Sequence, residues 1–396
     1  MVLSRLLDTD KPKLNITYFA PCGLEGGVGG GGRLRNMFDI LERLAARIHL
    51  VSYLPSDEFR IAVEQVNDHV HSTSVFVNKT FPPFLKAFAL LPILAYGLKH
   101  IRKSDVVFAH APGMVSGFPA FVLAKISGRP LVVDHMDIKD PETPAFIYNR
   151  VLRNSTADFA KSRFLEEEAR NIGCKNVFYI PIFVDTDRFK KDDVSRAKMR
   201  ERLGLDEKDI VIGYAGSFWQ GEGLPVLLRA FKNLSRRHDK IRLLLIGGRN
   251  VPNSDCVPEL IKELAIGDRV VLAGSQPHGV MPDYLSVMDI ACSPKIDCAE
   301  NRAANPIKIY EYMSVGLPSV VSSIGEISRV IENGCDGFLV RPGDEAELEK
   351  SLEYMVSNPD SARDIGQRAR AKIISNYTQE AMLYKVAGIL EHLNGK

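Results

Sequence analysis

The sequence lacks several features that would place it in a specialised class. Its six cysteines are scattered, with no C-x-x-C pair, so we expect neither a disulfide framework nor a zinc site and predict a reducing, cytoplasmic location. The net charge of +2 is too close to zero to indicate nucleic acid as a partner. No apolar run reaches the ~18 residues of a membrane span, and the N-terminus is too charged to be expected as a signal peptide.

Short apolar segments alternate with helical patterns along the whole chain. They cover residues 15–20, 48–53, 75–77, 106–109, 131–134, 158–160, 177–180, 210–214, 241–246, 270–273, 290–292 and 319–322. This alternation predicts parallel, doubly wound α/β sheets, and 396 residues suffice for two of them. A polar stretch near residue 190 predicts two Rossmann-like domains, 1–190 and 191–375, facing each other across a cleft. We expect a helix over 376–396 to return to the first domain.

Two glycine-rich turns follow predicted strands. The first contains G-x-G-x-x-G at Gly27, Gly29 and Gly32, where the backbone could approach a phosphate. With Asp57 as a ribose acid, the same loop would fit an NAD-dependent dehydrogenase, and it could also be a mobile loop that binds nothing. The second turn, Ala215–Gly223, precedes a helix and could host phosphate oxygens.

Polar side chains follow other predicted strands, where doubly wound sheets bind ligands. By this rule His110, His135, Asp137 and Ser162 face a crevice, although each could be a loop residue without chemistry. In contrast, the D-T-D at residues 185–187 follows a proline in a polar connection, so we interpret it as a linker without metal.

The segment Asn305–Val321 reads as a loop, a short helix, a turn and a buried strand. Lys308 and Glu311 lie three residues apart and therefore share one face of the helix. Because a helix N-terminus carries unpaired N–H groups, the same place can hold phosphate. We hypothesise that this segment binds a nucleotide-sugar.

Residues 80–103 combine apolar side chains with lysine, arginine and histidine. They could form a helix at a membrane interface, where anionic lipids attract the cations. They could equally form a buried crossover helix broken at Pro92.

The order of these segments resembles the family-four (group 1) glycosyltransferases of the two-Rossmann (GT-B) type. The resemblance is strongest over residues 155–376 and rests on STADFAKSRFLEEEARNIG, YIPIFVDTDRF, YAGSFWQGEGLPVLLRAF, IRLLLIGG, VVLAGSQPHGVMPDYLSVMDIACSP, NPIKIYEYMSVGLPSVV and ENGCDGFLVRPGDEAELEKSL. It implies a retaining, metal-independent transfer of a sugar from a nucleoside diphosphate donor, bound mainly by the C-terminal domain. The acceptor would be held mainly by the N-terminal domain.

The resemblance also implies residue roles. Glu311 matches the acid that holds the donor ribose, Lys308 fits a subset with a cation for the diphosphate, and His110 matches a histidine that contacts the transferred sugar. The predicted catalytic set is His110, Asp137 and Lys308; the predicted donor-binding set is Gly31, Gly32, Gly216, Ser217, Ser275, Arg302, Lys308 and Glu311. No metal and no cofactor are expected, since the nucleotide-sugar is a substrate.

The chain departs from the family pattern at three positions. Ala303 replaces the first acid of Glu-x7-Glu, with Glu300 and Arg302 nearby as substitutes, and Ser217 and Glu222 replace the usual Arg and Lys of the phosphate loop. Because fixed cations stabilise a departing diphosphate, we expect Arg302 and Lys308 to compensate.

The predicted function is a glycosyltransferase acting on a hydroxyl acceptor, such as a lipid-linked or surface glycan precursor. The chain would be cytoplasmic, with peripheral membrane contact through 80–103. Three further functions stay open for this sequence: a nucleotide-sugar epimerase of the same fold, a non-catalytic donor-binding partner and the dehydrogenase.

Overall fold

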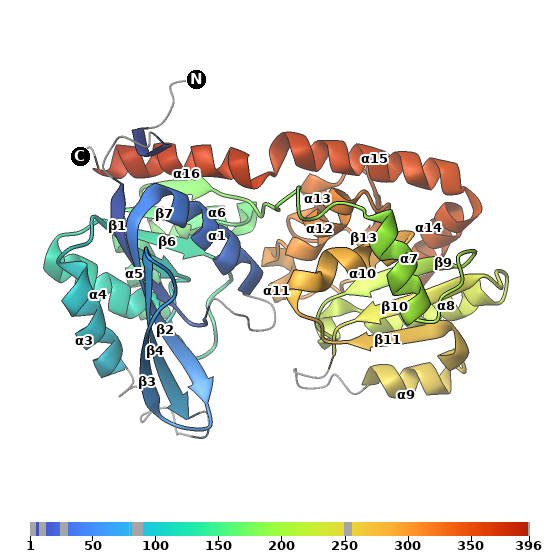
Figure 1. The fold of residues 1–396 in the computed structure, drawn as a ribbon, viewed down its shortest axis with the longest axis horizontal. Coiled ribbons are helices and arrows are strands. Elements are labelled where there is room, and N and C mark those ends of the chain that lie inside the picture. The colour runs from blue at the N-terminus through green and yellow to red at the C-terminus, as the bar shows by residue number, and fades with distance from the viewer. Residues whose placement is uncertain are drawn as a thin grey trace. The chain divides into compact units, whose positions relative to one another are not determined.

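The computed structural model describes residues 5–7, 13–23, 31–78, 80, 90–248 and 256–394, and it divides into two compact units. Unit 1 comprises Met1–Pro181 and Glu380–Lys396, and unit 2 comprises Ile182–Gln379 (Figure 1). The sequence placed the first boundary at residue 190. The intervening residues count with unit 2 because Ile182, Val184 and Phe189 are buried in its core.

Unit 1 is built on an eight-stranded sheet. Its strands are β1 (Leu14–Ala20), β2 (Ala45–Ser56), β3 (Arg60–Gln65), β4 (Val70–Asn78), β5 (Val106–His110), β6 (Leu131–His135), β7 (Ala157–Ala160) and β8 (Val177–Tyr179). Their order is β3-β4-β2-β1-β5-β6-β7-β8, and every pairing except β3 with β4 is parallel. The connections on either side of β1 run in opposite directions, so β1 and β5 flank the topological switch point.

Helices cover both faces of this sheet (Figure 1). They are η1 (Arg5–Leu7), α1 (Gly31–Leu44), α3 (Leu90–Ile101), α4 (Gly117–Ser127), α5 (Ala145–Asn154), α6 (Arg163–Ile172) and α16 (Gln379–Asn394). Neighbouring side chains of β1 point to opposite faces. The Tyr18 ring packs on Phe38 of α1, whereas Phe19 packs under Gly97 of α3, where a Cβ would lie 2.7 Å from its ring.

The predicted amphipathic stretch at 80–103 is described at Thr80 and from Leu90 onward. Helix α3 includes Pro92 near its start and runs on to Ile101, so Pro92 does not break it. Ile93, Gly97 and Ile101 are buried, as a crossover helix requires, while Leu91 and Leu98 are exposed. In the described part of the chain, no helix combines the length and apolarity needed to cross a bilayer.

Unit 2 contains a six-stranded, fully parallel sheet. Its strands are β9 (Ile210–Ala215), β10 (Ile241–Ile246), β11 (Val270–Gly274), β12 (Ile290–Ser293), β13 (Ser319–Ser322) and β14 (Phe338–Val340), in the order β11-β10-β9-β12-β13-β14. This is the dinucleotide-binding order, with the switch point between β9 and β12. The two parallel α/β units confirm the predicted fold class.

The helices of unit 2 are α7 (Asp193–Arg202), η2 (Gln220–Glu222), α8 (Leu224–Ser235), α9 (Cys256–Glu263), η3 (Gly267–Arg269), η4 (His278–Val280), α10 (Met281–Val287), α11 (Ala299–Ala303), α12 (Ile307–Val315), α13 (Ile327–Val330), α14 (Glu345–Ser357) and α15 (Pro359–Asn376). Val211 of β9 belongs to one core cluster and Ile212 to the other, so both faces of the sheet are covered.

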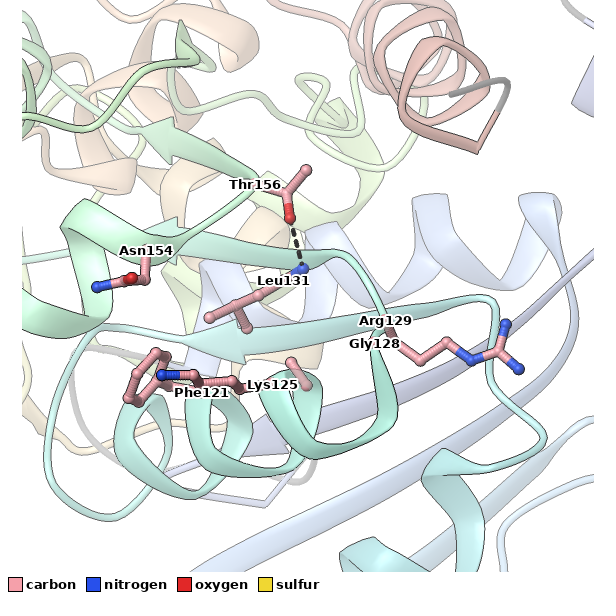
Figure 2. Close-up of a pocket in the computed structure, with 8 residues that line it drawn as sticks. Phe121, Lys125, Gly128, Arg129, Leu131, Asn154 and Thr156 are labelled. Atoms are coloured by element: carbon pink, nitrogen blue, oxygen red, sulfur yellow. Dashed lines mark hydrogen bonds between the residues drawn. The ribbon is translucent and has the colours of Figure 1, made fainter.

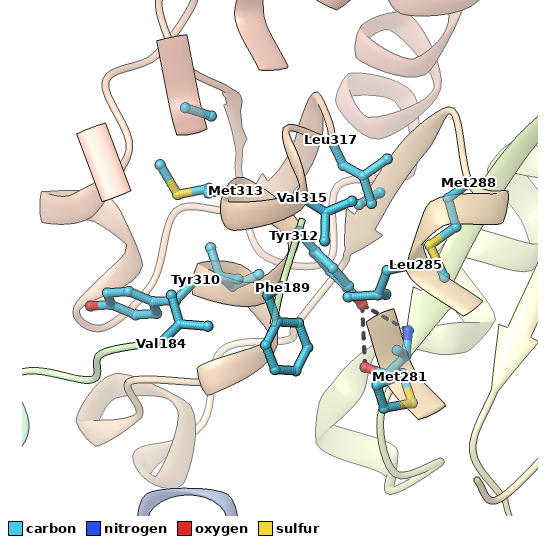
Figure 3. Close-up of a cluster of buried hydrophobic side chains, with 14 of the residues drawn as sticks. Val184, Phe189, Met281, Leu285, Met288, Tyr310, Tyr312, Met313, Val315 and Leu317 are labelled. Carbon is cyan, nitrogen blue, oxygen red and sulfur yellow. Dashed lines mark hydrogen bonds between the residues drawn. The ribbon is translucent and has the colours of Figure 1, made fainter. Parts of the chain in front are cut away.

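Helix α12 is held firmly against β9. Tyr310, Tyr312 and Met313 lie in the buried cluster drawn in Figure 3. The Tyr312 hydroxyl is 2.7 Å from the backbone nitrogen of Ala215, from which it accepts, and 3.3 Å from the Ala215 carbonyl oxygen, to which it donates (Figure 3). These contacts fix the helix that carries Lys308 relative to the loop after β9.

Candidate functional site

The switch point of unit 2 gathers residues from three segments. The turn after β9 runs from Gly216 to Gly223 and includes η2, and Lys295 follows the end of β12. Lys308 lies in the first turn of α12. Because β9 and β12 are neighbours in the sheet, their following loops meet at its carboxyl edge.

Glu222 is the centre of a buried ionic network at this edge. Its Oε2 accepts a hydrogen bond of 2.6 Å from Lys308 Nζ, and its Oε1 accepts one of 2.9 Å from Lys295 Nζ. Lys308 also donates to the Tyr214 hydroxyl at 3.0 Å, and Lys295 donates to Asn301 at 2.8 Å. All three ionic side chains are at most 11 % exposed, so the network is shielded from solvent.

The charges in this network stabilise one another. Burial would raise the pKa of the Glu222 carboxyl, but the ammonium groups of Lys308 and Lys295 hold that pKa at about 2. Burial lowers the pKa of Lys308 to about 8, although Glu222 opposes this effect. Two cations against one anion leave a net charge of +1 at neutral pH, which favours an anionic ligand at the sheet edge.

A glycine turn covers the Lys308 ammonium. Gly216 has φ +151°, and a Cβ there would lie 2.6 Å from Lys308 Nζ and 2.8 Å from the Tyr214 hydroxyl. A Cβ on Gly247, which follows β10, would collide with the Gly216 carbonyl oxygen. Only glycine therefore allows the two backbone segments and the ammonium to approach this closely.

Glu311, the predicted ribose ligand, is buried one turn along α12 from Lys308. Its Oε1 lies 2.6 Å from Nε2 of His278, a partly exposed residue in η4. The backbone oxygen of His278 accepts from Arg188, and its ring lies 5.4 Å from that of Phe189. A carboxylate has several lone pairs, so Glu311 can accept further hydroxyl donors while it contacts His278.

The remaining predicted donor residues lie in different surroundings. Arg302 forms a two-contact ion pair with Asp297 at 2.7 and 2.9 Å, and both side chains are more than half exposed. The Ser217 carbonyl accepts from the Tyr214 hydroxyl, and Ser275 follows β11 beside Gly248.

Lys295 was not among the predicted site residues, although the structure makes it the second buried cation beside Glu222. The rule that ligands gather after strand ends would have indicated it, because it comes two residues after β12.

Unit 1 has its own polar cluster at the carboxyl ends of β5 and β6. The Nδ1 of buried His110 lies 3.4 Å from Oδ2 of Asp134 and 3.3 Å from the Tyr18 hydroxyl. Arg33 donates to Asp134 at 2.8 Å and to the Ile180 carbonyl at 2.8 Å. Burial would raise the pKa of Asp134, but Arg33 and His110 lower it to about 2.

The residue after His110 has an unusual backbone. Ala111 has φ +72°, one of two such non-glycine residues in the described chain, and its N–H donates to the Asp134 carbonyl. Backbone strain of this kind is often found at functional sites, which supports His110 as a candidate functional residue.

The other predicted residues of unit 1 form a second cluster. Exposed Asp137 accepts 2.7 Å from Lys161, while buried His135 lies 2.7 Å from the Tyr148 hydroxyl and 3.2 Å from Asp158. Ser162 caps α6 by accepting from Leu165. This contact of Ser162 stabilises the start of α6.

Gly31 and Gly32 begin α1, whereas Gly27 and Gly29 lie outside the described residues. Asp185 accepts the N–H groups of Asp187 and Arg188, as expected of a capped linker turn. In the described ranges, no three His, Cys, Asp or Glu side chains are grouped to hold a metal.

A separate hollow lies at the opposite end of unit 1's sheet. It is lined by Phe121, Ala124, Lys125, Gly128, Arg129, Leu131, Asn154 and Thr156 (Figure 2). Leu131 begins β6 and Thr156 precedes β7, so this hollow adjoins the amino ends of the strands. His110 and Asp134 lie at the carboxyl ends, and the hollow does not belong to their cluster.

Comparison with known proteins identifies the family. Residues 195–372 match the family described as "Glycosyl transferases group 1". This part of the chain belongs to the group 1 glycosyltransferases. This glycosyltransferase is 24% identical over 306 residues to alpha-D-kanosaminyltransferase of Streptomyces kanamyceticus, covering 72% of this chain and 77% of the relative. It is 21% identical over 387 residues to N-acetyl-alpha-D-glucosaminyl L-malate synthase of Bacillus anthracis, covering 94% and 95%.

A third relative is matched over about half its length. The GDP-mannose-dependent alpha-(1-6)-phosphatidylinositol monomannoside mannosyltransferase of Mycolicibacterium smegmatis is 25% identical over 217 residues, which cover 54% of this glycosyltransferase and 55% of the relative.

Solved structures share the fold of the glycosyltransferase. Sucrose-phosphate synthase from Thermosynechococcus elongatus superposes with a TM-score of 0.81 at 16% identity, covering 97% of this chain and all of that one. Anabaena Alr3699/HepE in complex with UDP superposes with a TM-score of 0.76 at 20% identity, covering 96% and 100%. Another structure of the Anabaena protein contains UDP-glucose.

Proposed function

We propose that this glycosyltransferase moves a sugar from a nucleoside diphosphate sugar to a hydroxyl acceptor, with retention of configuration and without a metal ion. The proposal rests mainly on one observation, which is the buried Lys308 ammonium beneath the Gly216 turn at the switch point of unit 2. A fixed cation at this place can stabilise the charge of a departing diphosphate. The UDP complexes of the Anabaena protein support a nucleotide ligand for this fold.

The proposed donor contacts follow from the chemistry of unit 2. The backbone N–H of Ser217 and the N-terminus of α12 supply donors for phosphate oxygens, and Lys308 supplies positive charge. Glu311 accepts hydrogen bonds from the ribose hydroxyls. Ser275, after β11, lies at the same carboxyl edge of the sheet and contributes a hydroxyl.

The proposed chemical step needs no pair of hydrolase carboxylates. In a retaining transfer, the donor phosphate accepts the acceptor's proton on the face from which the diphosphate leaves, and the new glycosidic bond forms on that face. Lys308 stabilises the leaving group as negative charge develops. His110 contacts the transferred sugar through Nε2, since Asp134 faces Nδ1, and Asp137 orients the acceptor hydroxyl.

We propose a lipid-linked or surface-glycan acceptor and peripheral contact with the cytoplasmic face of a membrane. The support is the exposed side of α3, where Leu91 and Leu98 project beside Lys99. Apolar side chains next to cations are suited to an anionic lipid surface. Sedimentation with vesicles containing anionic lipid, compared with neutral vesicles, tests this part. The double variant Leu91→Ser/Leu98→Ser should bind the anionic vesicles more weakly than the wild-type protein, and equal binding contradicts the proposal.

A donor screen tests the main proposal. Thermal denaturation with UDP-, GDP- and ADP-sugars should show stabilisation by one nucleotide class, because a ligand of the native state raises its stability. NAD is the matched control, since a dehydrogenase would bind it instead. Stabilisation by NAD and by none of the nucleotide-sugars contradicts the proposal.

Turnover then separates a transferase from an epimerase and from a non-catalytic binder. A transferase releases nucleoside diphosphate rapidly only when an acceptor is present, whereas an epimerase converts the donor without acceptor and a non-catalytic binder leaves it intact. NMR of the purified product should show the anomeric configuration of the donor in the new bond. An inverted product contradicts the retaining mechanism.

A further inference from the structure

Glu222 stands where the family pattern has a lysine, yet the structure gives it a specific task. The carboxylate is bound on both oxygens, one by Lys308 and one by Lys295. If the family's lysine had simply been lost, the residue in its place would be exposed to solvent or would leave a cavity. Instead, the three charges are buried together and hydrogen-bonded, so their geometry is defined.

The network also extends beyond the three charges. Asn301 of α11 accepts from Lys295 through Oδ1 and donates through Nδ2 to the carbonyls of Gly221 and Ile296 at 2.7 and 2.9 Å. The loop that carries Glu222 is therefore tied to the segment that carries Lys295. Asn301 bonds the network to the backbone on the Lys295 side, and helix α12 carries Lys308 on the other side.

Lys308 reaches the donor site from a helix, whereas the phosphate-loop cations of the family pattern come from the loop itself. Within the described chain, Tyr214 and Glu222 take two of the three N–H donors of Lys308. One N–H therefore remains for a ligand. Gly216, whose backbone lies directly against this ammonium, leaves no room for a side chain between them.

We propose that Glu222 and Lys295 are positioning residues for Lys308: Glu222 holds the Lys308 ammonium beneath the Gly216 turn, and Lys295 keeps the Glu222 carboxylate ionised. The effect on donor binding rests on the proposed function, whereas the positioning itself does not. Relative to the usual phosphate loop, a carboxylate thus replaces the loop lysine, and the phosphate cation is the Lys308 ammonium on α12. Neither positioning residue needs to touch the donor.

The two positioning residues act on Lys308 in opposite directions. The ionisable groups that face its ammonium are Tyr214 of β9, Glu222 of η2, Cys292 of β12, Lys295 after β12 and Glu311 of α12. Of these, Glu222 and Glu311 raise the pKa of Lys308, while Lys295 lowers it. Removal of Glu222 should therefore lower the pKa of Lys308, and removal of Lys295 should raise it. A merely structural role would not produce shifts of opposite sign.

The experiment uses two conservative variants, Glu222→Gln and Lys295→Gln. The Lys308 ammonium is titrated by NMR in protein labelled with 13C-lysine, and Lys308→Arg assigns its signal. Glu222→Gln should move the titration to lower pH by at least about one unit, and Lys295→Gln should move it to higher pH. Asp336→Asn, which removes the carboxylate of the separate Lys372 pair, is the matched control and should leave the titration in place.

Calorimetric binding of UDP, GDP and ADP at a series of pH values links the network to function. Affinity should fall as the pH rises through the titration of Lys308, and this limb should move with the NMR value in each variant. An unchanged Lys308 titration in both variants overturns the positioning role. A pH dependence of diphosphate binding that does not follow the Lys308 titration overturns the effect on donor binding. If no diphosphate binds the wild-type protein, the proposed function fails, while the NMR titrations still decide whether Glu222 and Lys295 position Lys308. If Glu222→Gln does not fold, Lys295→Gln carries the same test.

Discussion

Gly216→Ala probes the closest approach in the proposed donor site. The new Cβ would lie 2.6 Å from Lys308 Nζ, whereas ordinary contact begins near 3.4 Å, so the ammonium must move by close to 1 Å. The φ of +151° adds strain of roughly 1–3 kcal/mol for any residue with a Cβ. A displacement of this size in a catalytic group can cost about 100-fold, or about 2.7 kcal/mol of transition-state stabilisation.

Two measurements separate displacement of Lys308 from general destabilisation. Steady-state kinetics should show kcat/KM for the donor reduced about 100-fold, and urea unfolding should show a folded protein with lower stability. Gly334→Ala is the matched control, since Gly334 has φ +79° but nothing within 4 Å of its would-be Cβ. It should lose about 1–2 kcal/mol of stability and no activity. Equal kcat/KM values for the two variants would refute the reasoning.

Three further predictions concern the charged residues. Arg302→Ala should leave the melting temperature nearly unchanged because its ion pair is exposed, and turnover nearly unchanged because Asp297 already binds the guanidinium; a large loss of turnover would support the prediction that Arg302 is a donor cation. Asp134→Asn should lower the free energy of unfolding by roughly 3 kcal/mol in urea, because Arg33 then stays buried without its counter-charge; an unchanged midpoint would speak against that ion pair. The pKa values of Glu222 and Asp134 are lowered to about 2, so the stability they contribute should be complete above the ordinary carboxyl range and decline as the pH falls from about 4 towards 2. The free energy of unfolding, measured over this pH range, should decline less steeply in Glu222→Gln than in the wild-type protein.

The fold was predictable because most strands are short, buried and apolar. β1, β5, β6, β9 and β10 all coincide closely with predicted segments, since a parallel sheet covered on both faces gives continuous apolar runs. Strand β3 could not be found in this way. Its residues are mostly exposed, and it pairs antiparallel at the sheet edge, so no apolar pattern marks it. Strand β14 has only three residues, too few for a pattern.

The candidate site was predictable only as far as local spacing allows. Lys308 and Glu311 share a helix, so their proximity follows from helical geometry. Glu222 is separated from Lys308 by 86 residues and from Lys295 by 73, and the pairings depend on the order of β9 and β12 in the sheet. From the sequence alone, Glu222 therefore indicates only that the usual lysine of the phosphate loop is missing.

The ion pair of Arg302 shows the same limit from the other side. A basic residue near the site suggested compensation for missing positive charge, but Asp297 lies within reach of its guanidinium in the folded loop. Which of several nearby charges remains available for a ligand depends on the tertiary pairing, which the sequence does not display.

The most direct test of the account is the turnover of Lys308→Ala at neutral pH, with the identified donor and acceptor. Release of nucleoside diphosphate should fall at least about 100-fold, because the cation that stabilises the leaving group is gone. Circular dichroism and the unfolding midpoint should show a folded protein, since Lys295 still neutralises Glu222. Near-normal turnover by a folded Lys308→Ala protein would contradict the central claim that Lys308 carries the diphosphate charge.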